Sequence, residues 1–139
     1  KIEAYHAKNQ TVIFTLDTHD DNYLKTQEGR KLPIPHCCEA LCRMASFMGR
    51  VAALRRAEDP TIEKPGFGSL ALAEHLRCAN FDQIEFVGLV SYICVISNAV
   101  LAKAALPEAE IIVDAACTAG ADHALHEEAL HVMEGLRSP

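Results

Sequence analysis

Hydrophobic and polar positions along the chain follow two alternating patterns. Short runs of β-branched and aromatic residues, typical of buried strands, occur at residues 11–16, 61–64, 83–90 and 110–114. Between and around them, apolar residues recur every three or four positions, as in helices that bury one face. The predicted helices are residues 1–8, 37–57, 69–78, 92–105 and 122–136. Residues 17–35 are polar and contain two prolines, which predicts a long loop.

This order of elements predicts an α/β fold, a three-layer Rossmann-like sandwich in which a parallel sheet carries helices on both faces. The strands at 83–90 and 110–114, joined by the helix at 92–105, form the clearest βαβ unit. The length predicts a single domain over residues 1–139. In such sheets ligands bind at the carboxyl ends of the strands, so polar residues that directly follow a strand are the candidates for function.

Two helices have predicted core faces. The residues expected to be buried are Leu70, Ala73 and Leu76 in the helix at 69–78, and Leu125, Ala129, Val132, Met133 and Leu136 in the last helix. Three glutamates of the last helix, Glu127, Glu128 and Glu134, are expected in solvent, together with His123, His126 and His131.

The composition of the chain excludes some kinds of binding partner and indicates the cellular compartment. The chain has 13 basic and 19 acidic residues, a net charge of −6 and no run of five like charges, which argues against nucleic acid. No apolar stretch reaches the roughly 18 residues of a membrane span, and no basic leader is visible. The six cysteines lack the regular spacing of a disulfide framework, so we expect reduced thiols and a cytoplasmic protein.

Candidate polar residues lie at the ends of three predicted strands: Asp17 and His19 follow the first strand, Lys64 closes the second, and Cys94 comes soon after the third. Cys94 lies at the start of the helix after the third strand, where backbone N–H groups and the helix dipole favour a thiolate. A lysine from a neighbouring strand end would favour it further. By residue type alone, however, a small buried apolar side chain is the commoner role for a cysteine such as Cys94.

The loop at 17–35 also collects possible metal ligands. Asp17, His19, Glu28 and His36 supply two carboxylates and two imidazoles, enough to hold a divalent ion with positions open for substrate, although polar loops often contain such residues without a metal. A weaker rival is the cluster of His36, Cys37, Cys38 and Cys42. Adjacent cysteines point apart on a helix and lack the spacing of structural zinc sites.

Together these segments resemble the isochorismatase-like cysteine hydrolases, and within them the nicotinamidase branch. The similar segments are residues 12–19 (VIFTLDTH), 62–67 (IEKPGF), 88–95 (GLVSYICV), 114–120 (DAACTAG) and 126–130 (HEEAL). The resemblance covers nearly the whole chain. The family's first strand, which carries a catalytic aspartate, has no counterpart in these 139 residues, so we expect an isochorismatase-like fold lacking that strand.

The resemblance implies roles for these residues. Cys94 would be the nucleophile and Lys64 the lysine that holds the thiolate and the intermediate. A cis peptide between Leu89 and Val90 would turn the N–H groups of Val90 and Cys94 into an oxyanion hole, and Phe67 would pack on the substrate ring. The implied metal ligands are Asp17, His19, Glu28 and His36, around a divalent ion, most commonly zinc, with iron and manganese as alternatives.

The implied activity is hydrolysis of nicotinamide to nicotinate and ammonia through a cysteine thioester, without an organic cofactor. Two alternatives stay open: hydrolysis of another small amide or carbamoyl compound, and a noncatalytic role suggested by the missing aspartate. The implied partner is a small-molecule amide, with no nucleic acid and no membrane. A missing strand would expose a sheet edge, so we expect a homo-oligomer or further N-terminal residues.

Overall fold

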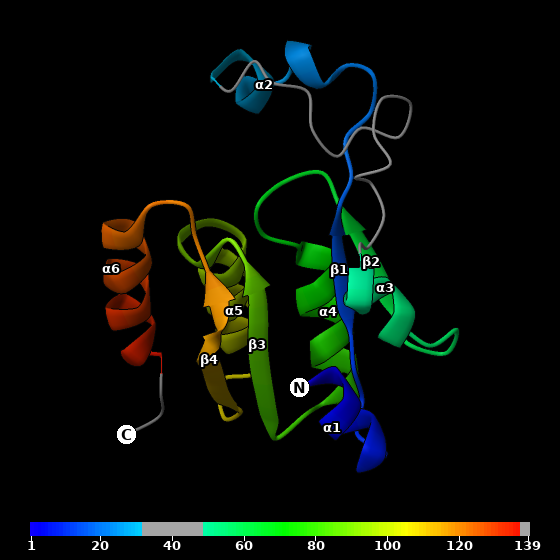
Figure 1. Cartoon of the computed structure of the whole chain (residues 1–139). Helices are drawn as coiled ribbons and strands as arrows, with labels where there is room; N and C mark the ends of the chain where they lie inside the picture. Colours follow the sequence, from blue (N-terminus) through cyan, green and yellow to red (C-terminus); the bar gives the residue numbers. More distant parts are fainter. Residues whose placement is uncertain (32–48, 137–139) are drawn as a thin grey trace. The chain divides into compact units, whose positions relative to one another are not determined.

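The structure is a computed structural model that describes residues 1–31 and 49–136. The described strands form two parallel pairs, with helices before, between and after them, which confirms the predicted α/β class (Figure 1). The chain divides into two compact units, Lys1–Gly66 and Phe67–Pro139, and each is described by itself.

The first unit is built on the parallel pair β1 and β2. Its elements are α1 (Ile2–Ala7), β1 (Phe14–Asp17), a 3-10 helix η1 (Tyr23–Lys25), α2 (Gln27–Lys31), α3 (Gly49–Leu54) and β2 (Thr61–Lys64). The strands run in register from Phe14 opposite Thr61 to Asp17 opposite Lys64. The predicted first strand is therefore correct in type but pairs only from residue 14. Of the predicted helix at 37–57, residues 49–54 are helical and residues 37–48 lie outside the described residues.

The prediction of a loop from residue 17 to residue 35 is wrong over η1 and α2. These two short helices lack a repeating apolar face, and local contacts stabilise them instead. The ring of Tyr23 is buried, and the Thr26 hydroxyl accepts a hydrogen bond from Gly29 N–H over 3.0 Å at the start of α2. A Cβ atom at Gly29 would collide with the Tyr23 carbonyl, so only glycine lets α2 lie this close to η1.

The second unit contains the predicted βαβ unit. Its elements are α4 (Leu70–Ala79), β3 (Gln83–Leu89), a π-helical turn η2 (Ser91–Val95), α5 (Ile96–Ala105), β4 (Glu110–Ala119) and α6 (His123–Glu134). In Figure 1, β3 and β4 lie side by side, and they pair in parallel from Gln83 opposite Glu110 to Leu89 opposite Ala119. Strand β4 therefore continues beyond the predicted end at Asp114. The register shifts between Phe86 and Gly88, where the glycine has a φ of 116°.

Helix α4 begins at the predicted cap, and the predicted burial of Leu76 is confirmed, but the buried face is shifted from the predicted one. Ser69 Oγ accepts a hydrogen bond from Leu72 N–H over 3.1 Å. Because α4 packs on α5, the buried pair is Leu72 and Leu76, four residues apart. Leu70, predicted to be buried, is 76% exposed.

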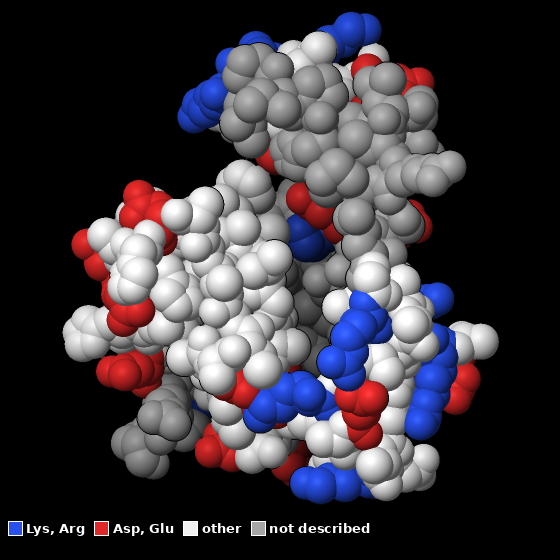
Figure 2. Space-filling view, viewed as in Figure 1, with Lys and Arg blue, Asp and Glu red and all other residues white. Residues whose placement is uncertain are grey.

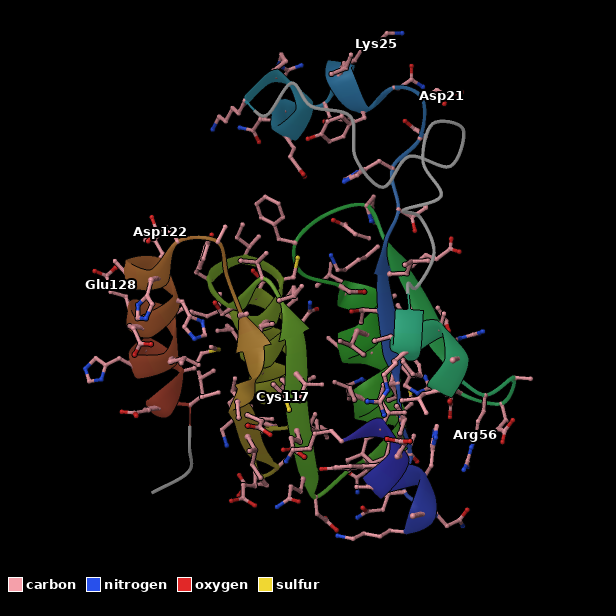
Figure 3. The ribbon with its side chains drawn as sticks, viewed as in Figure 1. Asp21, Lys25, Arg56, Cys117, Asp122 and Glu128 are labelled. Carbon is pink, nitrogen blue, oxygen red and sulfur yellow. The ribbon has the colours of Figure 1, made fainter. Side chains whose placement is uncertain are left out.

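Helix α6 also corrects the predicted core face. Ala129 and Met133 are buried, whereas Leu125 and Val132, which were expected in the core, are exposed, because the helix faces β4 and η2 with its 129/133 side. The expected exposure of Glu127, Glu128 and Glu134 is confirmed. Figure 2 shows acidic side chains gathered over α6, and in Figure 3 Glu128 lies on the side of the helix away from β4.

Among the described residues, no helix combines the length and apolar character that crossing a membrane requires.

Candidate functional site

Asp17 and Lys64 form an ion pair at the carboxyl ends of β1 and β2. The two residues are direct neighbours in the parallel register. Lys64 is 3% exposed, and its Nζ donates to Asp17 Oδ1 over 3.2 Å and to Gly66 O over 2.9 Å. A buried ammonium is costly unless it is paired and hydrogen-bonded. The parallel pairing of the strands thus supplies the carboxylate that permits a charged lysine at this buried position.

Two further predicted residues lie beside this pair. His19 is 5% exposed, and its Nε2 is 3.9 Å from Asp17 Oδ2 and 3.8 Å from Glu28 Oε1 of α2. Its ring lies against the ring of Tyr23, with centroids 4.6 Å apart. The structure therefore brings three of the four predicted metal ligands together. The fourth, His36, lies outside the described residues.

The donor types of this cluster suit a divalent cation, but its spacing is too wide. Two ligands at about 2.1 Å from a tetrahedral ion would lie about 3.4 Å apart, less than the 3.8 and 3.9 Å seen around His19 Nε2. Within residues 1–31 and 49–136, no group of three or more His, Cys, Asp or Glu side chains is arranged to hold a metal ion. A metal would need a small inward movement of Asp17 and Glu28.

A cavity of about 260 Å³ opens next to His19 in the first unit. Its lining residues are Thr18, His19, Asp20, Tyr23, Thr26 and Pro65. Because His19 lines this cavity, a small molecule or water there could approach the imidazole. Its volume lies just below the range of about 300–1,000 Å³ that is typical of small-molecule sites.

Cys94 lies in η2, the turn that directly follows β3. Its thiol is partly buried and forms no disulfide. The peptide bond between Leu89 and Val90 is cis, where the resemblance placed it. The Val90 carbonyl then accepts hydrogen bonds from the N–H groups of Ile93 and Val95, each over 3.1 Å, which closes the turn around Cys94. The predicted position of Cys94, between a strand end and a helix, is confirmed.

Helix α6 is tied to η2 by two polar contacts that the sequence did not reveal. His126 Nδ1 lies 2.9 Å from the hydroxyl of Ser91, which is fully buried, and Asp122 N–H donates to the Tyr92 hydroxyl over 3.3 Å. The expectation that His126 belongs to a solvated face is wrong for this residue. Its apolar neighbours on α6 gave no sign of a buried partner 35 positions earlier in the sequence.

Phe67 is 47% exposed at the start of the second unit, and its backbone is fixed by Asn98 of α5. The Asn98 amide donates to Phe67 O over 3.2 Å and to Cys94 O over 2.8 Å. Sequence reasoning missed Asn98 altogether. The one available signal was a polar residue four positions after Cys94 in an otherwise apolar, alanine-rich helix.

The predicted site residues thus fall into two groups. Asp17, His19, Glu28 and Lys64 are brought together in the first unit, and Phe67, Val90 and Cys94 lie in the second. In the first group these residues lie at or after the carboxyl ends of β1 and β2, and in the second Val90 and Cys94 follow the carboxyl end of β3, which is where α/β proteins bind ligands.

The fold and these strand-end residues define an α/β protein with a parallel-strand core and a cysteine after one of its strands. The isochorismatase domain model matches residues 1–137, so the chain belongs to the isochorismatase family. No curated protein matches the sequence significantly.

Several solved structures share the fold. A nicotinamidase from Bacillus subtilis superposes with a TM-score of 0.80 at 23% identity, over 96% of this chain and 75% of that one. A pyrazinamidase of Pyrococcus horikoshii in complex with zinc gives 0.79 at 20% identity, over 98% and 77%. An N-carbamoylsarcosine amidase from Thermoplasma acidophilum gives 0.75 at 22% identity, over 96% and 74%. At these identities the similarity establishes the fold.

Proposed function

We propose that the protein is a cysteine amidohydrolase of the nicotinamidase type, with Cys94 as its nucleophile. The observation that carries this proposal is the partly buried Cys94 in the turn that directly follows β3, in a chain of the isochorismatase family. A cysteine in such a turn, near backbone N–H groups, suits covalent catalysis better than packing alone.

The proposed reaction is acyl transfer. The Cys94 thiolate attacks the amide carbon, and the negative charge on the oxygen is stabilised by the N–H groups of Val90 and Cys94. The carbon–nitrogen bond breaks, and the nitrogen leaves as ammonia with the proton that the thiol gave up. Water then attacks the thioester, which releases the acid and restores the thiol.

We assign Lys64 to electrostatic stabilisation of the thiolate and of the intermediate, as the family resemblance implies. The Asp17 contact supports this assignment because it keeps the Lys64 ammonium fixed at the strand end. Phe67, whose side chain is about half exposed, is available to pack on the ring of an aromatic amide.

A divalent metal is the proposed cofactor, and its ligands would be Asp17, His19 and Glu28 together with His36. These carboxylate and imidazole donors suit zinc, iron or manganese. When bound, the ion would hold the ring nitrogen of a pyridine carboxamide. The zinc complex of the Pyrococcus horikoshii pyrazinamidase supports zinc as the first ion to test.

A second candidate is hydrolysis of an aliphatic carbamoyl compound, which the structural similarity to an N-carbamoylsarcosine amidase supports. The same nucleophile would serve both reactions, so the substrate panel must separate them. We also propose a cytoplasmic protein, because the spacing of the six cysteines is not that of a disulfide framework. We propose that it self-associates, because Leu89 is an exposed apolar residue at the end of β3.

Ammonia release by the full-length protein tests the proposal, with nicotinamide and an aliphatic carbamoyl compound as substrates. We expect turnover of nicotinamide by the wild type and loss of at least about 10³-fold in Cys94→Ala, since removing a covalent nucleophile leaves only binding and the oxyanion donors. Cys117→Ala, which removes an exposed thiol of β4 (Figure 3), is the matched control and should keep wild-type rates. Unchanged turnover in Cys94→Ala would refute the assignment.

A further inference from the structure

We propose that Asn98 is a positioning residue for this hydrolase: its side-chain amide fixes the backbone of Phe67 relative to the backbone of Cys94, and thereby sets how the substrate ring lies against the nucleophile. This inference rests on the proposed function. Asn98 donates to the backbone carbonyls of Phe67 and Cys94, so it would act through the two residues that it holds.

The Asn98 amide is buried and its hydrogen bonds define one orientation. The residue is 4% exposed. Its Oδ1 accepts from Ser69 N–H over 2.9 Å, while its Nδ2 donates to Cys94 O over 2.8 Å and to Phe67 O over 3.2 Å. One partner is a donor and two are acceptors, so a flipped amide would lose all three bonds. Three bonds also offset the cost of burying a polar side chain.

These bonds join segments that are far apart in the sequence. Phe67 and Ser69 precede α4, whereas Cys94 lies 25 or more positions later in η2. Between the two bonded residues, Gly68 passes close to α5, since a Cβ atom there would lie 2.8 Å from Leu101 Cδ1. The segment is therefore held against α5 by two hydrogen bonds and a tight approach. The backbone of Phe67 is fixed, while its ring remains half exposed.

The role differs from simple core packing. The other fully buried residues of α5 are Ala99 and Ala102, and an apolar residue at position 98 could fill the same space. Only a side chain with one acceptor and two donors can join Ser69, Phe67 and Cys94 at once. A shift of about 1 Å between a nucleophile and its substrate can cost about 10²-fold in rate. Turnover should therefore depend on a fixed position of Phe67 relative to Cys94.

Two substitutions separate the contacts. In Asn98→Thr, the hydroxyl can donate to the carbonyl four residues earlier, which is that of Cys94, but it cannot also reach Phe67 and Ser69. In Asn98→Asp, a carboxylate oxygen can still accept from Ser69 N–H. The second oxygen, however, replaces the NH₂ group that donates to the carbonyls of Phe67 and Cys94. Val100→Ala, on the exposed side of the same helix, is the matched control.

Steady-state kinetics with nicotinamide and an aliphatic amide are the first measurement. We expect Asn98→Thr to raise the KM for nicotinamide about tenfold while kcat changes less than about threefold, and to affect the aliphatic amide less. Asn98→Asp should lower kcat/KM by about 10²-fold, because both proposed functional residues lose their anchor. Val100→Ala should stay within about twofold of the wild type.

The second measurement does not depend on amidase activity. The rate of alkylation of Cys94 by iodoacetamide, measured by peptide mass spectrometry, should change at least about threefold in Asn98→Asp, while the rate at exposed Cys117 stays constant. Circular dichroism establishes which variants fold. If Asn98→Asp does not fold, Asn98→Thr alone tests the positioning role.

Folded variants with wild-type KM, kcat and Cys94 alkylation would overturn the inference. A wild type without amidase activity would refute the proposed function, and the alkylation rates would then decide the positioning role alone.

Discussion

At the scale of single residues, the Asp17–Lys64 pair is asymmetric. Lys64 is 3% exposed, whereas the Asp17 side chain is 25% exposed. Removing the carboxylate leaves a buried ammonium without its opposite charge, whereas removing the lysine leaves a carboxylate that water can reach. The two halves of the pair therefore contribute differently to stability.

We predict that Asp17→Asn destabilises the protein by about 3 kcal/mol, because breaking a buried pair by removal of one partner costs about 3–5 kcal/mol. Lys64→Met, which fills the same space without a charge, should cost less than about 1.5 kcal/mol. Urea unfolding of both variants measures the difference. A larger loss in Lys64→Met than in Asp17→Asn would contradict this reading of the pair.

A second residue-scale prediction concerns pH. Asp59 is 7% exposed, and burial alone would raise its pKa. Hydrogen bonds from Arg56 N–H over 2.7 Å and from His6 Nε2 over 3.1 Å outweigh burial, so the pKa of this carboxyl is lowered. The Asp59 carboxyl therefore binds a proton more readily in the unfolded chain than in the folded one. Its contribution to stability is complete above the pKa of an aspartate in the unfolded chain, about 3.9.

Stability from Asp59 should therefore be lost as the pH falls below about 4. In Asp59→Asn, the decline of the free energy of unfolding between about pH 6 and about pH 3 should be shallower than in the wild type. Urea midpoints across this range measure both slopes. Identical slopes would show that the ionised Asp59 carboxyl does not stabilise the fold.

At the scale of elements, the cap of α4 gives a direct prediction. Ser69 is buried, and its hydroxyl accepts from Leu72 N–H, so Ser69→Ala leaves that N–H without its partner in the helix's first turn. We expect a loss of about 1–2 kcal/mol in the free energy of unfolding. Asp122→Ala removes the corresponding cap of α6, where Asp122 Oδ1 accepts from Leu125 N–H at an exposed position (Figure 3), and should cost about 0.5–1 kcal/mol. Equal effects would argue against burial as the cause of the difference.

Element types followed from sequence wherever an apolar pattern was strong. The runs at 61–64 and 83–90 became β2 and β3 because β-branched residues favour extended pairing, and Ser69 capped α4 as predicted. The sequence did not, however, predict which face of each helix is buried. Leu70 and Leu72 are equally apolar, and only packing on α5 decides which of them is buried.

The residues of the candidate site likewise fall into those that the sequence predicted and those that it did not. Asp17, Lys64 and Cys94 were predictable because each stands at or just beyond a strand end, a position that the sequence marks. Asn98, Ser91 and His126 were not, because their roles depend on partners 29 to 35 positions away. The helices η1 and α2 were missed since Tyr23, Thr26 and Gly29 stabilise them through specific contacts instead of an apolar stripe.

At the scale of the whole molecule, metal binding should be linked to folding. An ion that binds the folded state at 100 times its dissociation constant adds about 2.7 kcal/mol of stability. We predict that removing metal with a chelator lowers the Tm of the full-length protein, and that zinc restores it. His19→Ala, which removes the buried imidazole between Asp17 and Glu28, should abolish the zinc-dependent rise in Tm. A zinc-dependent rise that persists in His19→Ala would place the ion elsewhere.

The most direct test of the central claim, covalent catalysis by Cys94, is a partitioning measurement on the full-length protein. Nicotinamide turnover is followed in the presence of hydroxylamine, and ammonia and the hydroxamate are measured in the same reaction. A thioester intermediate predicts that the wild type forms the hydroxamate in competition with nicotinate and that Cys94→Ala forms neither. Ammonia release without any hydroxamate, continuing unchanged in Cys94→Ala, would contradict the account.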